Sequence, residues 1–446
     1  MSDATIVSVS ERVPVAGEWD VVVCGAGPAG VGAAIAAGRL GRSVLLVEME
    51  QRLGGLISNA NIGTFCDTPG GPIFDEMLAR LEELGAASVL VNRDRYYPPG
   101  RWRCHPGTTA TILMEMAREA GVDLLLTTMA ERALVADGAV DGVIIVNKAG
   151  RSLVRARVVV DCTADADIAA RAGASFVQGD PEDGRVQHCN FRWGVEGVQS
   201  ETLPPPEELE ALCAEAVASG AIQPPDAIFG VDRDCFPFSR EAGSMVLGGW
   251  ELQRVDPTDP HETTEATAQC QLAALQVVRF LRERVSGCED CRMRSGGIFT
   301  TRESRRIVGD YTVTAEDVLS GAKFEDGAVP AWFWTDLHDP APGHSTPYPR
   351  EYVVANRPKP GDWYEIPYRC LLPDRPEGLL VAGRCVSCDR LTQGSLRVVP
   401  TAMYLGEAAG TAAAWAIQEG VQPREVDGAR LKRVLNEDYW QPPMYE

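Results

Sequence analysis

The clearest chemical pattern in the chain is three glycines, Gly25, Gly27 and Gly30, in the spacing Gly-x-Gly-x-x-Gly. In this spacing the first glycine permits a tight turn, the second lets the backbone approach a pyrophosphate, and the third lets a helix pack closely on a strand. Pro28 and Ala29 suit the first turn of a helix, whose N-terminal N–H groups and positive dipole favour phosphate. The pattern predicts a dinucleotide-phosphate site at this turn.

The segments on either side of the turn have the composition of a strand–turn–helix–strand unit. Residues 20–24 are apolar and β-branched, residues 31–40 are rich in alanine, and residues 43–47 form a second apolar run. Glu48 ends that run, 18 residues after Gly30, where its carboxylate is placed to accept hydrogen bonds from a ribose diol. We expect an adenosine ribose without a 2′-phosphate. The alternative is a glycine turn that only packs a helix on a sheet.

Three later segments favour FAD over NAD, which the first unit alone does not separate. Directly after Glu48, the residues Met49 and Arg52 lead into the glycine pair Gly54-Gly55. A glycine pair lets the backbone pass close to a cofactor that extends beyond the pyrophosphate. We therefore include Met49, Arg52, Gly54 and Gly55 among the cofactor-binding candidates.

The second segment, residues 124–161, reads as short strands with turns at Asp137-Gly138 and at residues 148–150. This pattern predicts a β-meander that returns to a parallel sheet and contains Ala130, a further cofactor-binding candidate. The loop that follows, with Thr163, Ala164 and Asp165, is expected at the carboxyl edge of the sheet, where ligands bind.

The third segment lies near the end of the chain. Residues 378–384 form an apolar run that ends in Gly383-Arg384, and residues 400–418 have the small side chains of a closely packed helix. Val399 and Thr401 stand at the start of this helix. Its positive dipole would face the pyrimidine edge of a flavin, where negative charge develops on reduction.

Together these segments resemble the FAD-dependent oxidoreductase family of the glutathione-reductase-type flavoproteins. The resemblance covers residues 20–48, 161–167, 304–310, 366–369 and 378–413, and includes the more particular Ser304-Arg-Arg-Ile-Val-Gly-Asp310. It implies FAD as cofactor and redox chemistry, and implies little about the substrate. The chain departs from the family at Cys162-Thr-Ala-Asp165, where the family usually has Ala-Thr-Gly-Asp. A second Gly-x-Gly-x-x-Gly unit is absent, so a separate NAD(P)H domain is not expected.

The expected fold class is α/β, with a Rossmann-like FAD-binding domain of a parallel sheet plus a β-meander, and an inserted α+β substrate or cap domain. Residues 207–219 and 263–285 are expected as helices of that insertion. The predicted division is an FAD-binding domain at 1–60, 106–172 and 374–420, a cap insertion at 61–105, a substrate domain at 173–373, and a C-terminal tail at 421–446 packed on the FAD domain.

Catalytic candidates come from the middle of the chain. Arg305 belongs to a stretch that holds Arg302, Arg305 and Arg306, and an arginine fork binds carboxylate, phosphate or flavin carbonyl oxygens. The alternative is an ion-paired turn that fixes the substrate domain to the cofactor sheet, through Glu303 or Asp310. Tyr311 follows as a candidate, with Tyr364 and Tyr368 as weaker ones.

Histidine is the side chain best suited to take a proton near neutral pH when a hydride leaves an alcohol or amine. His105, before the expected helix at residues 108–120, and His344, in a proline-rich loop that also holds His338, are candidates. The alternative for each is a hydrogen-bonded loop residue.

Two Cys-x-x-Cys pairs, Cys288/Cys291 and Cys385/Cys388, occur among 13 cysteines. Their separation, and the position of the second pair directly after Gly383-Arg384, argue against a joint metal site, and no metal is expected. A redox pair beside the flavin and simple packing residues are the two remaining interpretations.

The balance of 42 Lys+Arg against 63 Asp+Glu gives a net charge of −21, which disfavours nucleic acid and anionic membranes as partners. The N-terminus has no signal-peptide run, so a cytoplasmic location is expected. The expected partner is a small-molecule substrate, and a homo-oligomer is left open.

The first functional hypothesis is an FAD enzyme that moves a hydride between flavin N5 and a small polar organic substrate, as a dehydrogenase, oxidase or reductase. The second is a flavin monooxygenase or halogenase, since Trp363-Tyr-Glu-Ile-Pro367 is loosely similar to the halogenase Trp-x-Trp-x-Ile-Pro signature but lacks its second tryptophan. The third is a non-catalytic flavin-binding redox sensor.

Overall fold

The apolar runs around the glycine turn form neighbouring parallel strands. The computed structural model describes residues 10–90, 101–223, 237–241, 243–247, 250–252, 254–338 and 350–436. Within them, seven strands make one sheet, in which β6, β2, β1, β9 and β19 run parallel. Their bounds are β1 (Val15–Cys24), β2 (Val44–Val47), β6 (Asp123–Leu125), β9 (Gly150–Asp161) and β19 (Leu379–Val381).

The register places the carboxyl ends of these strands side by side. Cys24 of β1 pairs with Val47 of β2 on one side and with Asp161 of β9 on the other, and Val381 of β19 also pairs with Asp161. Loops that leave the four strand ends therefore emerge at one edge, which is where ligands bind in open α/β sheets.

The predicted β-meander is confirmed. Strands β7 (Met129–Ala136), β8 (Ala139–Asn147) and β9 are antiparallel neighbours. The first half of β9 pairs with β8 and its last residues pair with β19, so the sheet divides along this long strand. The turn at Asp137-Gly138 has φ of 51° and 82°, the positive values that a tight hairpin requires.

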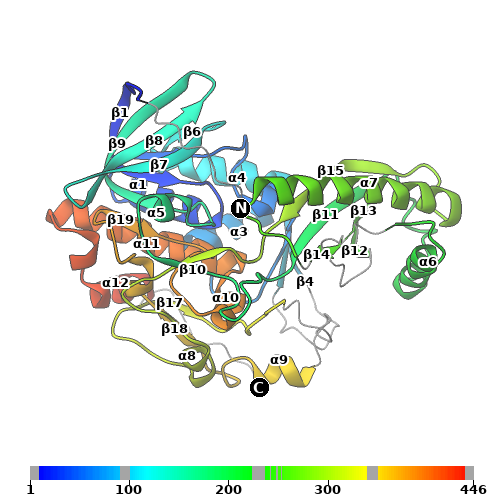
Figure 1. Cartoon of the computed structure of the whole chain (residues 1–446). Helices are drawn as coiled ribbons and strands as arrows, with labels where there is room; N and C mark the ends of the chain where they lie inside the picture. Colours follow the sequence, from blue (N-terminus) through cyan, green and yellow to red (C-terminus); the bar gives the residue numbers. More distant parts are fainter. Residues whose placement is uncertain are drawn as a thin grey trace.

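Helices α1 (Pro28–Arg39) and α11 (Val399–Glu419) pack on one face of the sheet with their backbones in close contact (Figure 1). A Cβ added to Gly406 would lie 1.9 Å from the carbonyl oxygen of Ala29, and one added to Gly410 would lie 2.1 Å from that of Ala33. Their main hydrophobic core also takes in α3 (Pro72–Glu83), α4 (Pro106–Glu119) and α12 (Gly428–Asn436). The opposite face of the sheet carries α5 (Asp167–Arg171) and a second core.

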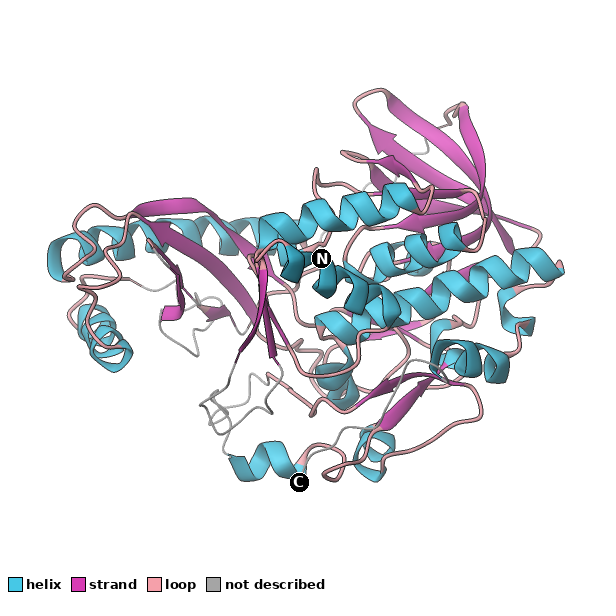
Figure 2. Ribbon diagram, turned by 180° about the vertical axis from the view of Figure 1, so that it is seen from behind, coloured by secondary structure: helices cyan, strands magenta, loops and turns pink. Residues whose placement is uncertain are grey.

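A second lobe projects to one side of the molecule (Figures 1 and 2). It is an antiparallel sheet covered by the long helix α7, and its core includes the fully buried Phe191, Trp193 and Trp250. Asp259 caps α7 by accepting a hydrogen bond from the His261 N–H at 2.7 Å. The elements are β11 (Cys189–Glu196), α6 (Pro206–Ala218), β12 (Pro237–Glu241), β13 (Ser244–Leu247), β14 (Glu251–Leu252), α7 (Pro260–Arg284) and β15 (Arg292–Thr300).

The remaining described elements are short strands and helices. The small sheets are β3 (Thr64–Phe65), β5 (Arg101–Cys104) and β4 (Ala87–Leu90); β10 (Phe176–Gln178) with β16 (Arg305–Ile307); and β17 (Gly327–Ala331) with β18 (Tyr364–Pro367). The short helices are α2 (Leu56–Asn59), α8 (Ala315–Ser320), α9 (Arg350–Ala355) and α10 (Arg390–Leu396), with 3-10 turns at Tyr368–Leu371 and Pro423–Glu425.

The cores divide the chain differently from the expected domain boundaries. Within the expected cap insertion at 61–105, α3 contributes Ile73, Phe74 and Met77 to the main core. Within the expected substrate domain at 173–373, only residues 189–291 supply the core of the second lobe, whereas β17 and β18 belong to the main core. The second lobe is therefore smaller than the interval between the cofactor segments.

Candidate cofactor and active site

A side chain would meet different surroundings at each of the three glycines of the first turn. Gly25 has φ of 95°, and a Cβ there would lie 2.5 Å from the Cys162 carbonyl oxygen. A Cβ on Gly30 would lie 1.7 Å from the Gly25 carbonyl oxygen. A Cβ on Gly27 would meet no atom within 4 Å. Gly25 and Gly30 thus close the turn, while Gly27 borders open space at the start of α1, where Pro28, Ala29 and Gly30 begin the helix without a side-chain cap.

Glu48 is buried at the end of β2, with 8% of its surface exposed. Its carboxylate accepts hydrogen bonds from the backbone N–H groups of Ala26 at 2.6 Å and Glu50 at 2.8 Å. Each carboxylate oxygen keeps further acceptor capacity, which a ribose diol can use. Met49 is exposed beside it, and Ala130 is buried in strand β7 of the meander.

The predicted glycine pair folds back over the first turn. The Gly54 N–H donates to the Ala26 carbonyl oxygen at 2.8 Å, and a Cβ on Gly55 would lie 2.9 Å from Gly27 Cα. Gly54 and Gly55 have φ of 100° and 53°, a conformation that favours glycine. Arg52 is exposed in the same loop. Two segments predicted to approach one cofactor therefore meet.

The loop after β9 is held by a buried carboxylate. Asp161 accepts hydrogen bonds from the Thr163 N–H at 3.0 Å, the Thr163 hydroxyl at 2.6 Å and the Ala169 N–H at 2.8 Å. Burial raises the pKa of the Asp161 carboxyl above its ordinary value, because desolvation outweighs these hydrogen bonds. Ala164 and Ala166 have φ of 70° and 52°, which is uncommon for residues with a Cβ. Ala164 is the position at which the family usually has glycine, so the chain keeps the turn without the residue that adopts it most easily.

Asp165 joins this loop to two distant segments. Its Oδ1 accepts a hydrogen bond from Arg384 Nη2 at 2.5 Å and another from the Ser304 hydroxyl. Arg305 Nη1 donates to the Asp165 carbonyl oxygen at 3.1 Å and pairs with Asp167 Oδ1 at 3.0 Å. The Ser-Arg segment thus ties the loop to the Gly-Arg segment. The guanidinium of Arg305 is engaged in this junction, and its catalytic role stays a prediction.

The start of α11 has buried polar atoms without partners. Thr401 is fully buried, and its Oγ1, like Nε of Arg384, has no hydrogen-bond partner among the described residues. Gly383 has φ of 100° and lies against Ala29, so the Gly-Arg turn meets the start of α1. Unpaired buried polar atoms cost about 1–3 kcal/mol each, which a bound polar group would recover. Together with the open space at Gly27, these unpaired atoms make the strand ends and the start of α11, at Val399, a candidate site for the polar groups of FAD.

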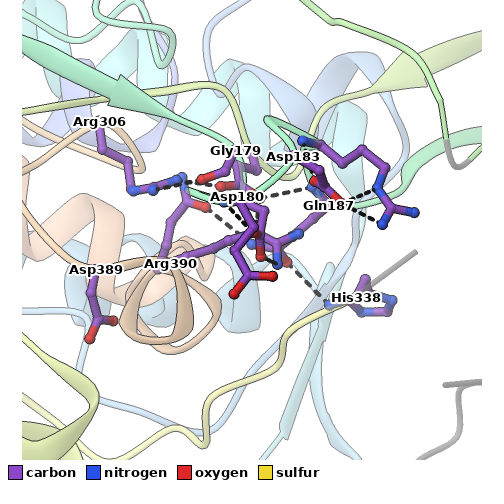
Figure 3. Close-up of polar contacts among 12 residues, drawn as sticks. Gly179, Asp180, Asp183, Gln187, Arg306, His338, Asp389 and Arg390 are labelled. Carbon is purple, nitrogen blue, oxygen red and sulfur yellow. Dashed lines mark hydrogen bonds and ion pairs between the residues drawn. The ribbon is translucent and has the colours of Figure 1, made fainter. Parts of the chain in front are cut away.

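A buried polar network lies next to this edge (Figure 3). Glu303 is fully buried and pairs with Arg306, and it also pairs with Arg390 Nε at 3.2 Å. Arg390 Nη1 reaches Asp180 Oδ2 at 3.2 Å. Glu303 Oε2 further accepts the Gln187 N–H at 2.8 Å. The alternative interpretation of the arginine stretch is an ion-paired turn with Glu303 or Asp310 as the acidic partner. The stretch does form such an ion pair, between Arg306 and Glu303.

Gln187 carries the network toward a histidine. Its Oε1 accepts a hydrogen bond from the backbone N–H of His338 at 3.2 Å, and its Nε2 donates to Gln393 Oε1 at 3.1 Å. Gln393 Nε2 donates in turn to the Arg384 carbonyl oxygen at 3.1 Å. Figure 3 shows Gln187 between Arg390 and His338. Hydrogen bonds thus connect the Gly-Arg turn with His338.

His338 has a carboxylate partner that the sequence did not indicate. Its Nε2 lies 3.3 Å from Asp336 Oδ1, and the side chains are 12% and 20% exposed. Arg397 Nη2 donates to the Asp336 carbonyl oxygen at 2.9 Å. Although burial opposes it, the positive charges of His338, Arg397 and Arg302 lower the pKa of Asp336 to about 2. The spacing Asp336-Leu-His338 and the arginine before α11 were the available signals.

Each of the other described catalytic candidates has its own hydrogen-bond partner. His105 caps α4, and its Nδ1 accepts the Thr108 N–H at 3.2 Å. Tyr311 donates to Asp317 Oδ2 at 3.0 Å, and burial raises the pKa of its phenol to about 12. His344 lies outside the described residues. Tyr364 pairs with the Ser395 hydroxyl at 2.8 Å, and Tyr368 donates to the Pro423 carbonyl oxygen at 2.7 Å. Their catalytic roles stay predictions.

The cysteines of the second Cys-x-x-Cys pair belong to different cores. Cys385 packs in the core on the α5 face of the sheet, and Cys388 packs in the main core. Burial raises the thiol pKa of both above its ordinary value. Cys288 and Cys291 are buried in the second lobe. Among the described residues, no three His, Cys, Asp or Glu side chains are grouped so as to hold a metal ion.

A model of the FAD dependent oxidoreductase family matches residues 20–435. The chain belongs to this family. It is an FAD-dependent oxidoreductase with FAD as its cofactor, as the sequence predicted. No curated protein matches the chain in a sequence comparison.

Solved structures with a similar arrangement are distant in sequence. A geranylgeranyl bacteriochlorophyll reductase-like protein from Thermoplasma acidophilum is 12% identical, with 95% of this chain and 84% of that one covered and a TM-score of 0.44. The p-nitrophenol 4-monooxygenase PnpA from Pseudomonas putida DLL-E4 is 12% identical, over 94% and 86%, with a TM-score of 0.47. The myxobacterial chondrochloren halogenase CndH is 14% identical, over 94% and 78%, with a TM-score of 0.46.

None of the described helices is long and apolar enough to cross a membrane.

Proposed function

We propose that the protein transfers a hydride between flavin N5 and a small polar organic substrate, as a flavoprotein of the glutathione-reductase type. The observation that carries the proposal is the meeting of the Gly27 turn, the Gly54-Gly55 pair and the Gly383-Arg384 turn at one edge of the sheet, beside the unpaired Thr401 hydroxyl. The β-meander between the cofactor segments supports the same type of flavoprotein.

Each cofactor-binding residue has one task in this proposal. The start of α1 would bind the pyrophosphate through backbone N–H groups, and Glu48 would accept the ribose hydroxyls. The start of α11, at Val399 and Thr401, would place positive dipole at the pyrimidine edge. FAD supplies a two-electron acceptor and donor, which no side chain of this chain can replace.

The substrate side needs a group that takes or gives a proton. We propose His338 for this task, because Asp336 orients its imidazole and would stabilise it once protonated. Backbone hydrogen bonds hold His338 on both sides: its N–H donates to Gln187, and its carbonyl oxygen accepts the His188 N–H at 3.1 Å. His105, Arg305, Tyr311 and His344 are second choices.

The test is an absorbance spectrum of the purified protein, followed by anaerobic mixing with small alcohols, amines and hydroxy acids. We expect a flavin spectrum that bleaches with at least one donor. A protein that bleaches only with NADH or NADPH, and then consumes oxygen with an aromatic compound, would instead be a monooxygenase or halogenase. A protein that no donor reduces, but whose shape changes on chemical reduction, would be a sensor. Protein without flavin, and without affinity for added FAD, would contradict all three.

A further inference from the structure

Arg397, two residues before the first residue of α11, has an unpaired guanidinium N–H. Nη2 is anchored on Asp336, at 2.9 Å from its carbonyl oxygen and 3.5 Å from Oδ2. Nε has no hydrogen-bond partner among the described residues, although the side chain is only 14% exposed. A buried charged donor without an acceptor is costly, so this arrangement calls for an acceptor that a ligand brings.

Both positive and negative groups lie around Arg397. Burial, and then the positive charge of Arg302, lower the pKa of Arg397. Asp336 opposes this shift, and Cys66 and Glu303 oppose it more weakly. His338 lies on the other side of Asp336 and adds a positive charge whenever it is protonated. A carboxylate presents two oxygens in the geometry that an arginine fork binds.

An aromatic cluster is formed by residues that stand near Arg397 and its partner Asp336 in the chain. The cluster consists of Phe333, Trp334, Val353 and Val398, with Tyr352 and Cys66 packed against it. It is joined to Arg397 through the adjacent residue Val398 and through Cys66, whose thiol is within electrostatic range of Arg397. Its four core members keep 5–8% of their surface exposed. The rings of Trp334 and Tyr352 meet edge to face, with centroids 6.2 Å apart.

We infer that the substrate carries a carboxylate, bound by Arg397, on an aromatic or bulky apolar body that packs against the Phe333–Trp334 cluster. The inference rests on the proposed function, and it adds the class of substrate. His338 then lies next to the carboxylate end, within the same group of side chains as Asp336.

The alternative source of an acceptor for Arg397 is the flavin, since Arg397 stands two residues before Val399. The two sources make different predictions for the same variant. If the guanidinium binds the flavin, Arg397→Gln loses FAD affinity. If it binds the substrate, Arg397→Gln keeps FAD and loses its preference for carboxylates.

The experiment uses the oxidised holoprotein and needs no turnover. Benzoate is titrated in parallel with benzamide, a neutral molecule of the same shape, and binding is followed by flavin difference absorbance and by the flavin-fluorescence melting temperature. In the native protein we expect saturable benzoate binding at least about 10-fold tighter than benzamide binding, because a hydrogen bond to a charged group is worth about 1.5–3 kcal/mol. Arg397→Gln should weaken benzoate about 10- to 100-fold and abolish the preference over benzamide.

Two further variants separate the parts of the ligand. Trp334→Leu should weaken benzoate more than acetate, because only benzoate packs on the cluster. Arg375→Gln, which removes an exposed arginine elsewhere on the molecule, should change neither ligand. FAD content per protein is measured for every variant.

Three results would overturn the inference: a native protein that holds FAD but does not prefer benzoate to benzamide, an Arg397→Gln protein that keeps the preference, or an Arg397→Gln protein that loses FAD with the preference intact after reconstitution. These results are independent of flavin bleaching by donors, so a failed hydride-transfer proposal and a failed carboxylate inference are told apart.

Discussion

The two lobes bury their interiors in opposite ways. In the FAD-binding lobe, glycines bring backbone against backbone, as where Gly30 meets Gly25 and Gly406 meets Ala29. In the second lobe, bulky side chains such as Phe191, Trp193 and Trp250 fill the space between a sheet and α7. Backbone contacts leave a ligand room to approach main-chain N–H groups, whereas side-chain packing closes the space. We therefore propose cofactor contacts for the glycine-lined lobe and a purely structural role for the aromatic side chains of the second lobe.

The largest expected effect is at Gly30. Gly30→Ala would place a methyl group 1.7 Å from a backbone oxygen that cannot move without opening the β1–α1 turn. We expect a loss of more than about 4 kcal/mol in the free energy of unfolding, or failure to fold. Chemical denaturation followed by circular dichroism measures it.

Gly27→Ala is the matched variant, since its added methyl meets no protein atom within 4 Å and its φ is −66°. It should fold with an apoprotein melting temperature close to the native one and bind FAD at least about 10-fold more weakly, because the methyl points to where the pyrophosphate is proposed. Normal FAD binding by Gly27→Ala would show that the pyrophosphate lies elsewhere.

Phe191→Ala tests the independence of the second lobe. Phe191 is fully buried and packs on Gly297, so its removal should cost about 3–5 kcal/mol. We expect proteolysis within the second lobe at a lower temperature, with the flavin absorbance unchanged at 20 °C or below. Leu272→Ala, at a 64% exposed position on α7, is the control. Simultaneous loss of flavin would mean that the two lobes unfold as one unit.

Glu407 gives a pH-dependent comparison within the FAD-binding lobe. It lies in α11 against the start of α3, and burial raises the pKa of its carboxyl to about 7; the Ile73 N–H and Arg39 oppose this shift, and Asp75 and Glu76 add to it. A raised carboxyl pKa gives stability that is present below pH 4.5 and is lost as the pH rises to about 7. Glu407→Gln should therefore gain roughly 3 kcal/mol over the native protein between pH 4 and pH 8. Denaturant unfolding at both pH values measures it, and a constant difference would mean that Glu407 does not titrate in this range.

The smallest expected effect is at the capping box of α8. Thr314 Oγ1 accepts the Asp317 N–H at 3.3 Å, and Asp317 Oδ2 accepts the Thr314 N–H at 2.9 Å. Thr314→Ala should cost about 1 kcal/mol, and Thr314→Ser should restore most of it. An equal loss in both variants would show that the methyl group, and not the hydroxyl, matters.

The strand–turn–helix–strand unit of the FAD-binding fold could be predicted because its signals are local. The strand before Gly25, the acid after the second strand and the glycine pair at Gly54-Gly55 lie within 36 residues of one another. The helices expected at 207–219 and 263–285 formed as α6 and α7, and α7 starts earlier because Asp259 caps it.

The contacts at the proposed substrate site could not be predicted in the same way. Asp336 and Arg397 are 61 residues apart, and only the packing of α10 against the Asp336 backbone, where a Cβ on Gly394 would lie 2.7 Å away, brings them together. Nothing in the spacing of single arginines or histidines distinguishes a side chain that will pair across the fold from one that will remain in a loop.

The position of β19 and α11 near the end of the chain has a consequence for synthesis. The sheet that begins with β1 gains its last parallel strand only after residue 381, and α1 gains α11, the helix with which it makes its most extensive contact, only after residue 419. During translation, the alanine-rich face of α1 therefore stays exposed while most of the chain leaves the ribosome. Such sequence-distant contacts delay folding, so a chain truncated before α11 would be a substrate for chaperones and proteases before it could ever acquire its flavin.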